Sequence, residues 1–473
     1  MTTTQPVGER RVIANVLRGS IGNLVEWYDW YVYAAFSVYF AKSFFPAEDP
    51  TAQLLSAAAL FAVGFLMRPI GGWLLGRYAD RFGRRSALTL SVSVMAAGSL
   101  LIALTPGYQT IGLAAPIILL LARLLQGLSV GGEYATSATY LSEVASSGKR
   151  GFYSSFQYVT LVAGQLVALG VQIILQQFLD NAQMDNWGWR IPFVIGAAGA
   201  LVVMWLRRGM DESEQFEAVV EAERSDTASA LPHGRDTADE MSGRPAPARG
   251  SLRMLLQYPR ECLLVMGLTL GGTVAFYTYT TYMQKFMIYT SGISKPTVAW
   301  INFIALLVFV VLQPLAGGLS DRIGRRKLLM FFGVAGALLT VPIMTVLAHT
   351  KNPIAAWALM MLALVIITGY TSINAIVKAE LFPTKIRALG VGLPYALTVA
   401  IFGGTAEMIA VALKKAGHES LFFWYVAGCI GISLITYYFM RETSKESTID
   451  AEAPAADTAS APEEERELTP ARS

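Results

Sequence analysis

Ionisable side chains interrupt several of the longest apolar stretches of this chain. The five that lie deepest in such stretches are Glu26, Asp29, Arg68, Arg123 and Glu407. A charged group inside a membrane-spanning helix is costly and marks a functional path by default. Spacings of three and four residues put Glu26, Asp29 and Tyr33 on one face of a helix. The pattern therefore predicts acids and arginines gathered around one buried site.

Buried acids and arginines together can couple an anion to a proton. A carboxyl group takes up a proton more readily when a neighbouring arginine turns away to bind an anion. We expect Asp29 to be the proton carrier, with Glu26 as the second choice and Glu407 as the third. Arg68 and Arg123 would bind substrate carboxylates, because a guanidinium group is a planar fork suited to them. The alternative is that Asp29 or Glu26 pairs with Arg123 only to neutralise both charges.

Hydroxyl, amide and amine groups in other apolar stretches could complete such a site. The candidates for contact with substrate are Gln157, Tyr277, Lys285 and Tyr370. Any one of these could serve ordinary packing between helices. Together these four side chains would face the two arginines. Such a set predicts a cavity for a small anion that is rich in oxygen atoms. Histidine is not expected to carry the proton, because all three histidines lie in loops or at helix ends.

The composition indicates which elements must position these side chains. The 473 residues are 54% hydrophobic and only 15% charged, and the mean hydropathy is +0.46. Soluble domains carry about a quarter charged residues, so we expect an integral membrane protein. A spanning helix needs about 20 apolar residues. Twelve such runs lie near residues 17–41, 52–75, 86–105, 112–134, 152–178, 188–206, 261–287, 296–317, 327–348, 353–377, 388–412 and 420–440.

A ten-residue loop pattern occurs twice, 241 positions apart. Residues 76–85 and 317–326 carry Gly, Asp, Arg, Gly, Arg and Arg in identical register. The alternative is that two unrelated basic loops lie on the same side of the membrane. Six shared residue types at corresponding positions of the two loops favour the duplication of a six-helix unit instead.

A second repeated pattern supports this duplication. Glu143 precedes Arg150 by seven residues, and Glu380 precedes Arg387 by seven. We expect the repeated loops to latch the two halves together at one membrane face and not to touch substrate. The predicted gating residues are Gly76, Asp80, Arg84, Glu143, Arg150, Asp321, Arg325, Glu380 and Arg387.

The expected organisation is two bundles joined by a polar linker. The N-terminal six-helix bundle spans 1–208, the linker 209–255, the C-terminal bundle 256–440 and a disordered acidic tail 441–473. Lysine and arginine crowd alternate loops, so both termini are expected in the cytoplasm. The first apolar run is too long for a cleavable signal peptide and contains two acids. Nothing indicates a cofactor, a metal site or a nucleic-acid partner, and the two cysteines fall inside predicted helices.

Several stretches resemble one family of membrane transporters. They are residues 22–29, 64–72, 123–134 and 187–193, together with the doubled loop. This pattern is similar to the metabolite:proton symporter family of the major facilitator superfamily. The resemblance implies a twelve-helix fold in two pseudo-symmetric halves that work by alternating access. In related sugar porters a Tyr-Asp pair works with a helix 4 arginine, and Tyr28, Asp29 and Arg123 match those positions.

The resemblance also implies an activity. Family members carry 2-oxoglutarate, citrate, shikimate or zwitterionic osmolytes with protons, so we expect a monomeric symporter in a bacterial inner membrane. Its expected partners are a small organic anion, protons and the lipid bilayer. From this resemblance, import of 2-oxoglutarate or a related dicarboxylate is the leading hypothesis. Two buried arginines favour a dianion over a zwitterion, but they do not choose among the acids. A citrate, shikimate or osmolyte carrier and a transport-like receptor are the alternatives. An enzyme would need a nucleophile with its base, a metal cluster or a phosphate loop, which the sequence lacks.

Overall fold

A computed structural model describes residues 9–46, 49–82, 84–131, 148–207, 255–383 and 386–445. All of the regular structure in these ranges is helical. Glu143, most of the expected linker and the tail beyond residue 445 lie outside them. Gly76, Asp80 and Arg84 lie in helices, but their surroundings are not among the described parts.

Within the described ranges, the first half contains six long helices and three short helical segments. They are α1 (Glu9–Phe44), α2 (Pro50–Phe82), α3 (Arg84–Leu104), α4 (Tyr108–Ile111), α5 (Ala114–Val130), α7 (Arg150–Phe178), α8 (Asn181–Asn186), η1 (Gly188–Arg190) and α9 (Ile191–Arg207). The second half repeats this plan with three of its spans divided into shorter segments. They are α12 (Pro259–Tyr277), η2 (Thr278–Tyr282), α13 (Met283–Tyr289), α14 (Lys295–Ile323), α15 (Arg325–Ala348), α16 (Pro353–Thr371), α17 (Asn374–Ala379), α18 (Arg387–Thr398), η3 (Val399–Gly403), α19 (Gly404–Lys415) and α20 (Glu419–Phe439).

These elements form twelve helical segments that correspond to the twelve predicted runs. In the described ranges, nine are long and apolar enough to cross a membrane. Two more are the shorter apolar helices Thr89–Leu104 and Ala114–Val130. The twelfth is α1, in which Glu26, Asp29 and a run of Trp and Tyr residues interrupt the apolar pattern. The chain is a multi-pass membrane protein, as predicted.

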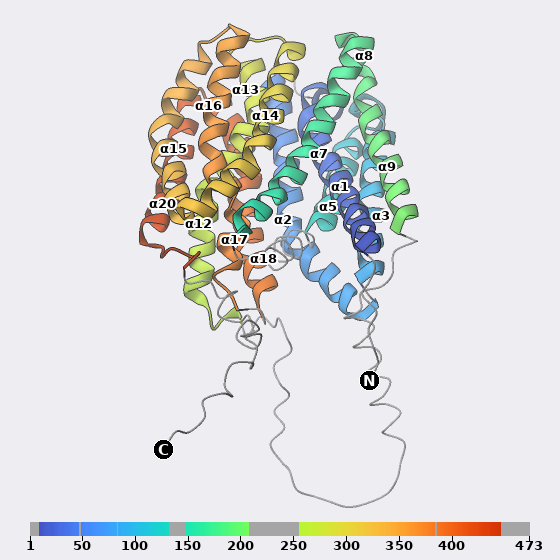
Figure 1. Cartoon of the computed structure of the whole chain (residues 1–473). Coiled ribbons are helices and arrows are strands. Elements are labelled where there is room, and N and C mark those ends of the chain that lie inside the picture. Colours follow the sequence, from blue (N-terminus) through green and yellow to red (C-terminus); the bar gives the residue numbers. More distant parts are fainter. Residues whose placement is uncertain are drawn as a thin grey trace, which may run out of the picture.

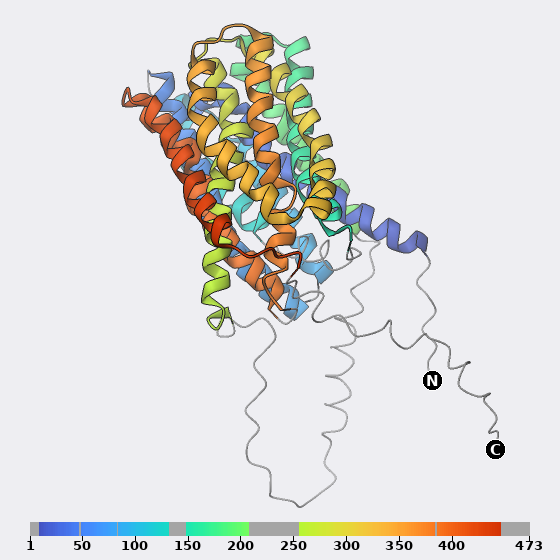
Figure 2. The same ribbon diagram turned by 60° about the vertical axis from the view of Figure 1, so that its left-hand side comes forward.

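The two halves stand side by side, α1 to α9 in blue and green and α12 to α20 in yellow to red (Figure 1). Contacts between the halves run along α7 and α14 and along α2 and α19. The turned view keeps the two sets of helices roughly parallel (Figure 2). At this boundary α7 and α2 of the first half meet α14 and α19 of the second.

Glycine allows the closest approach inside the first half. A Cβ atom on Gly127 of α5 would lie 2.1 Å from the Gly64 carbonyl oxygen of α2. No real Cβ atom approaches an oxygen so closely, so only glycine permits this contact. This close approach lies near Arg123 of α5 and Arg68 of α2 in the sequences of the two helices.

Two π-helical turns interrupt the second half. They are η2, between α12 and α13, and η3, between α18 and α19. π-Helical turns are rare, and they are frequent at functional sites. Both lie in helices that face the first half.

Candidate functional site

Arg68 and Arg123 share one aromatic ring. The guanidinium carbon of Arg68 lies 4.2 Å from the centroid of Trp30, and that of Arg123 lies 4.3 Å from it. Phe65 and Tyr33 supply a second ring to each cation, at 4.0 and 4.2 Å. Cation–π contacts of this kind offset part of the cost of burying a positive charge. The two arginines that the sequence singled out therefore lie together, held by α1, α2 and α5.

The arginines keep unused hydrogen-bond donors. Arg123 is fully buried and Arg68 is 6% exposed. Within the described ranges, the Nε and Nη2 atoms of both side chains are buried without a hydrogen-bond partner. A buried charged donor without a partner is expensive, and an anion with several oxygen atoms would satisfy these donors. This pair of cations is the core of the candidate site.

A polar chain leads from Arg123 toward Asp29. Arg123 donates to Gln126 Oε1 at 2.7 Å, and Gln126 Nε2 donates to the Ser99 hydroxyl at 2.9 Å. That hydroxyl lies beside the Asp29 carboxylate. Asp29 is fully buried, and its oxygens make no regular hydrogen bond within the described ranges. No ion pair joins Asp29 to Arg123 there, so Gln126 and Ser99 link them instead.

Glu26 occupies a separate polar pocket inside the first half. Its Oε1 atom accepts a hydrogen bond from the Ser91 hydroxyl of α3 at 3.2 Å. Ser91 also contacts Ser129 of α5, with 2.9 Å between the two hydroxyls. Glu26 therefore faces hydroxyl groups on α3 and α5, whereas Asp29, three residues on, faces Ser99 and α9.

A buried ion pair lies across from the arginines. Lys285 of α13 donates to Glu407 Oε1 of α19, and each side chain is at most 4% exposed. Arg123 and Tyr33 are within electrostatic reach of Glu407. Tyr277 packs edge-on against Phe65, with 5.0 Å between ring centroids. The expected Lys285, Glu407 and Tyr277 are thus brought to the face that meets the first half.

Tyr370 and Gln157 are placed differently from each other. Tyr370 is fully buried within the second half, and its ring fills the space that a Cβ on Gly272 would need. It packs against Phe332 of α15, with 5.7 Å between centroids. Gln157 is 2% exposed on α7, the helix that runs along α14. Tyr370 therefore packs against α12 from within the second half, while Gln157 is buried on a helix that contacts both α14 and α1.

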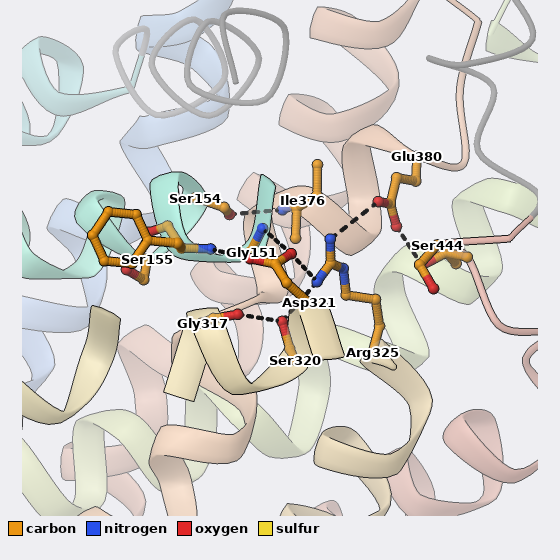
Figure 3. Close-up of polar contacts among 12 residues, drawn as sticks. Gly151, Ser154, Ser155, Gly317, Ser320, Asp321, Arg325, Ile376, Glu380 and Ser444 are labelled. Atoms are coloured by element: carbon orange, nitrogen blue, oxygen red, sulfur yellow. Dashed lines mark hydrogen bonds and ion pairs between the residues drawn. The ribbon is translucent and has the colours of Figure 1, made fainter. Parts of the chain in front are cut away.

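A carboxylate joins the halves at the end of the bundle where α7 begins and α14 ends, here called the basic end. Asp321 of α14 accepts hydrogen bonds from the backbone N–H groups of Gly151, at 2.8 Å, and Phe152, at 3.0 Å (Figure 3). Arg325 donates to the same carboxylate at 2.7 Å. The first turn of a helix attracts negative charge, so Asp321 caps α7 from the opposite half. Ser154 adds a further link, because its hydroxyl accepts from the N–H of Ile376 at 3.0 Å.

Glu380 extends this network inside the second half. It lies 3.8 Å from Arg325, and Thr443 donates to its other oxygen at 2.5 Å (Figure 3). Burial raises the pKa of the Glu380 carboxyl above its ordinary value, while attraction to Arg325 and Arg150 opposes the rise. Arg387 donates from Nε to the carbonyls of Ala379 and Phe382, at 3.2 and 3.1 Å. Arg150 and Glu380 come from different halves. Their attraction therefore holds this end closed, in addition to the hydrogen bonds between Asp321 and the first turn of α7.

A second set of charges joins the halves at the opposite end. Asp185 of α8 pairs with Lys42 at 2.6 Å and with Lys295 at 3.5 Å. Lys295, the first residue of α14, also donates to the Val38 carbonyl of α1 at 3.1 Å. The sequence analysis did not select these residues, although isolated charges in short loops were the available signal. The halves are therefore in contact at both ends, with the arginines enclosed between them.

Comparison with known proteins gives a consistent result. The family described as "Sugar (and other) transporter" matches residues 16–453. The alpha-ketoglutarate permease of Escherichia coli K12 is 51% identical, over 92% of this chain and 95% of the permease. The citrate-proton symporter of Salmonella typhi is 34% identical over 90% of this chain and 94% of that protein. The proline/betaine transporter of E. coli K12 is 30% identical over 95% of this chain and 87% of that protein.

Solved structures agree on the fold. The proton:xylose symporter XylE, described as a major facilitator superfamily protein, superimposes with a TM-score of 0.71 at 19% identity. The match covers 94% of this chain and 99% of that one. At this identity the likeness establishes the twelve-helix architecture alone.

Proposed function

This chain belongs to the sugar (and other) transporter family of the major facilitator superfamily, and on that premise we propose that it is a proton-coupled symporter that imports 2-oxoglutarate or a closely related dicarboxylate. Its relatives are transporters, and it is a transporter and not an enzyme. The observation that carries the substrate class is the pair Arg68 and Arg123, whose unused donors lie against one shared indole ring.

The charge of the site favours a dianion. Each guanidinium group can bind one carboxylate in a bidentate manner. A zwitterionic osmolyte would place an ammonium group near one of the two cations, and like charges repel. The 51% identity to an alpha-ketoglutarate permease, against 34% to a citrate-proton symporter, supports 2-oxoglutarate over citrate as the proposed substrate.

The polar chain in the first half supports Asp29 as the proton carrier. When Arg123 turns toward a substrate carboxylate, Gln126 loses its partner at 2.7 Å and the chain toward Ser99 and Asp29 rearranges. Asp29 would then exchange its proton with the side to which the site is open. Glu26 stays the second choice, because Ser91 already donates to it.

The two charged clusters would act as gates. Asp321, Arg325, Arg150 and Glu380 would close the basic end, and Asp185 with its lysines would close the opposite end. Asp80 and Arg84 of the first loop copy are proposed to act as Asp321 and Arg325 do. By the distribution of basic residues, the basic end and both termini would face the cytoplasm of a bacterial inner membrane. We expect the transporter to work as a monomer without nucleic-acid partners.

Uptake into proteoliposomes tests this function. Purified protein should exchange labelled 2-oxoglutarate in counterflow and accumulate it when the outside is acidic. Citrate, shikimate and betaine, each offered unlabelled in excess, should compete weakly. Strong competition by citrate with weak competition by 2-oxoglutarate would identify a citrate carrier instead. Absence of any acid-driven accumulation would refute proton symport.

A further inference from the structure

The ion pair between Lys285 and Glu407 is incompletely satisfied. Lys285 donates to one oxygen of Glu407, while the other oxygen, Oε2, is buried with no hydrogen-bond partner in the structure. A buried ion pair repays its desolvation only when further hydrogen bonds satisfy the remaining atoms. Within the described residues, Glu407 therefore has one direct hydrogen-bond partner, Lys285.

Each member of the pair follows a π-helical turn. η2 ends at Tyr282, three residues before Lys285, and η3 ends at Gly403, four residues before Glu407. η2 continues α12 without a break, α12 packs against η3, and α19, which carries Glu407, contacts η2. An irregular turn permits a change of helix register at lower cost than a regular one. The pair thus lies where the backbones that carry it can move apart.

The groups around Glu407 belong to the candidate substrate site. Arg123 of α5 and Tyr33 of α1 act on it from the first half, and Tyr282 of η2 acts on it from the second. Lys285 is its direct partner. An anion bound at Arg123 would therefore compete with Glu407 for the two cations that neutralise it.

We infer that Glu407 is a second proton carrier, and that a substrate dianion travels with two protons, one on Asp29 and one on Glu407. The inference rests on the proposed function. A substrate carboxylate accepts hydrogen bonds from Lys285, and Glu407 loses its partner. Because an unpaired buried carboxylate is costly, Glu407 binds a proton from the side to which the site is open. When the substrate leaves, Lys285 pairs with Glu407 again and displaces that proton.

The charges balance in this scheme. Two protons and one dianion carry no net charge, so the membrane potential does not oppose import. With a single proton, one net negative charge would enter against a negative interior. A potential of 100 mV would then lower the accumulation about 50-fold. One carboxyl group in each half, Asp29 and Glu407, provides the required two sites.

The ratio of protons to substrate tests the inference. Proteoliposomes are clamped with potassium and valinomycin, and labelled 2-oxoglutarate uptake is measured alongside internal pH. The wild type should give a ratio of two and no response of accumulation to potential. Glu407→Gln should give a ratio of one and about a 50-fold loss of accumulation at 100 mV, inside negative. Glu407→Asp should restore a ratio of two.

A matched control and a second variant complete the test. Glu419→Gln removes the acid of another ion pair of the second half, with Lys414 at 3.3 Å, and should keep a ratio of two. If Glu407→Gln does not fold, Lys285→Gln serves, because Glu407 would then stay protonated throughout and the ratio should fall to one.

Two results would overturn the inference. One is a ratio of two, insensitive to potential, in Glu407→Gln or in Lys285→Gln. The other is a ratio of one in the wild type. Either would leave proton symport of 2-oxoglutarate standing. If the wild type instead failed to accumulate 2-oxoglutarate under a pH gradient, the proposed function itself would be wrong.

Discussion

Replacing Asp321 by Asn should open the basic end of the transporter. The carboxylate accepts two backbone hydrogen bonds from the first turn of α7, at 2.8 and 3.0 Å, and these contacts must break when the halves part there. An asparagine keeps the size of the side chain but removes its charge. The substitution should therefore destabilise the state in which the basic end is closed and leave the free energy of the open state unchanged.

The size of the effect follows from these contacts. Oδ1 and Oδ2 of Asp321 each accept one of these bonds, whereas asparagine has one acceptor oxygen, so one bond becomes neutral and the other is lost. Each change costs roughly 1 kcal/mol. The loss of charge at the helix N-terminus adds about 0.5 kcal/mol. Because the Asp321 side chain is only 8% exposed, little of this is screened. The sum of about 2.5 kcal/mol corresponds to about a 70-fold change in the equilibrium between closed and open basic ends.

Cysteine labelling measures this equilibrium. Ser155, fully buried on α7 beside Gly317, becomes a cysteine in a background in which Cys262 and Cys429 are serine. In nanodiscs a polar maleimide reaches both ends of the protein. When closing is fast compared with labelling, the labelling rate follows the fraction of protein that is open at the basic end. The Asp321→Asn variant should then be labelled up to about 70-fold faster than the parent protein.

The opposite end supplies the control for this experiment. Asp185→Asn weakens the contacts with Lys42 and Lys295, so it should not accelerate labelling at Ser155→Cys. Equal labelling rates in Asp321→Asn and the parent protein would refute the capping argument. Equal acceleration by both variants would indicate general loosening instead of a gate.

Three further predictions concern the site and the packing around it. Arg123→Lys should weaken 2-oxoglutarate binding at least tenfold in equilibrium binding, because lysine lacks the guanidinium fork, whereas Arg190→Lys, outside the site, should bind normally. Asp29→Asn should abolish acid-driven accumulation but keep counterflow exchange, and accumulation in this variant would place the proton site elsewhere. Gly127→Ala should lower the unfolding temperature, at a cost of about 1–3 kcal/mol, because its Cβ would lie 2.1 Å from a carbonyl oxygen. Gly428→Ala, with nothing within 4 Å, should be neutral, and equal stability of the two alanine variants would contradict the packing argument.

The sequence was sufficient for the spans and for the charges inside them. A run of about 20 apolar residues crosses a bilayer as a helix, and two buried arginines can bind the carboxylates of one anion, so Arg68 and Arg123 could be predicted to lie at one site. The doubled loop likewise predicted Asp321 and Arg325 at one end. Each of these inferences depends only on residue types and on their spacing along the chain.

Contacts between distant helices could not be predicted in the same way. Ser99 is one serine among many, and only the packing of α3 against α5 brings it to Gln126 and Asp29. Asp185 and Lys295 lie 110 positions apart and meet because α8 and α14 belong to facing halves. The π-helical turns carry no periodicity signal, because one extra residue per turn is set by packing on both sides.

The contact between Asp321 and α7 also determines which mutations this gate tolerates. On the α7 side the donors are backbone N–H groups, so most side-chain replacements at Phe152 leave the contact intact. Proline, which has no N–H group, is the exception. Gly151 is constrained for another reason, since a Cβ there would meet the Ser320 hydroxyl at 2.3 Å. Variation at this gate should therefore accumulate at Phe152, while Gly151 in the same half and Asp321 in the other half must be kept.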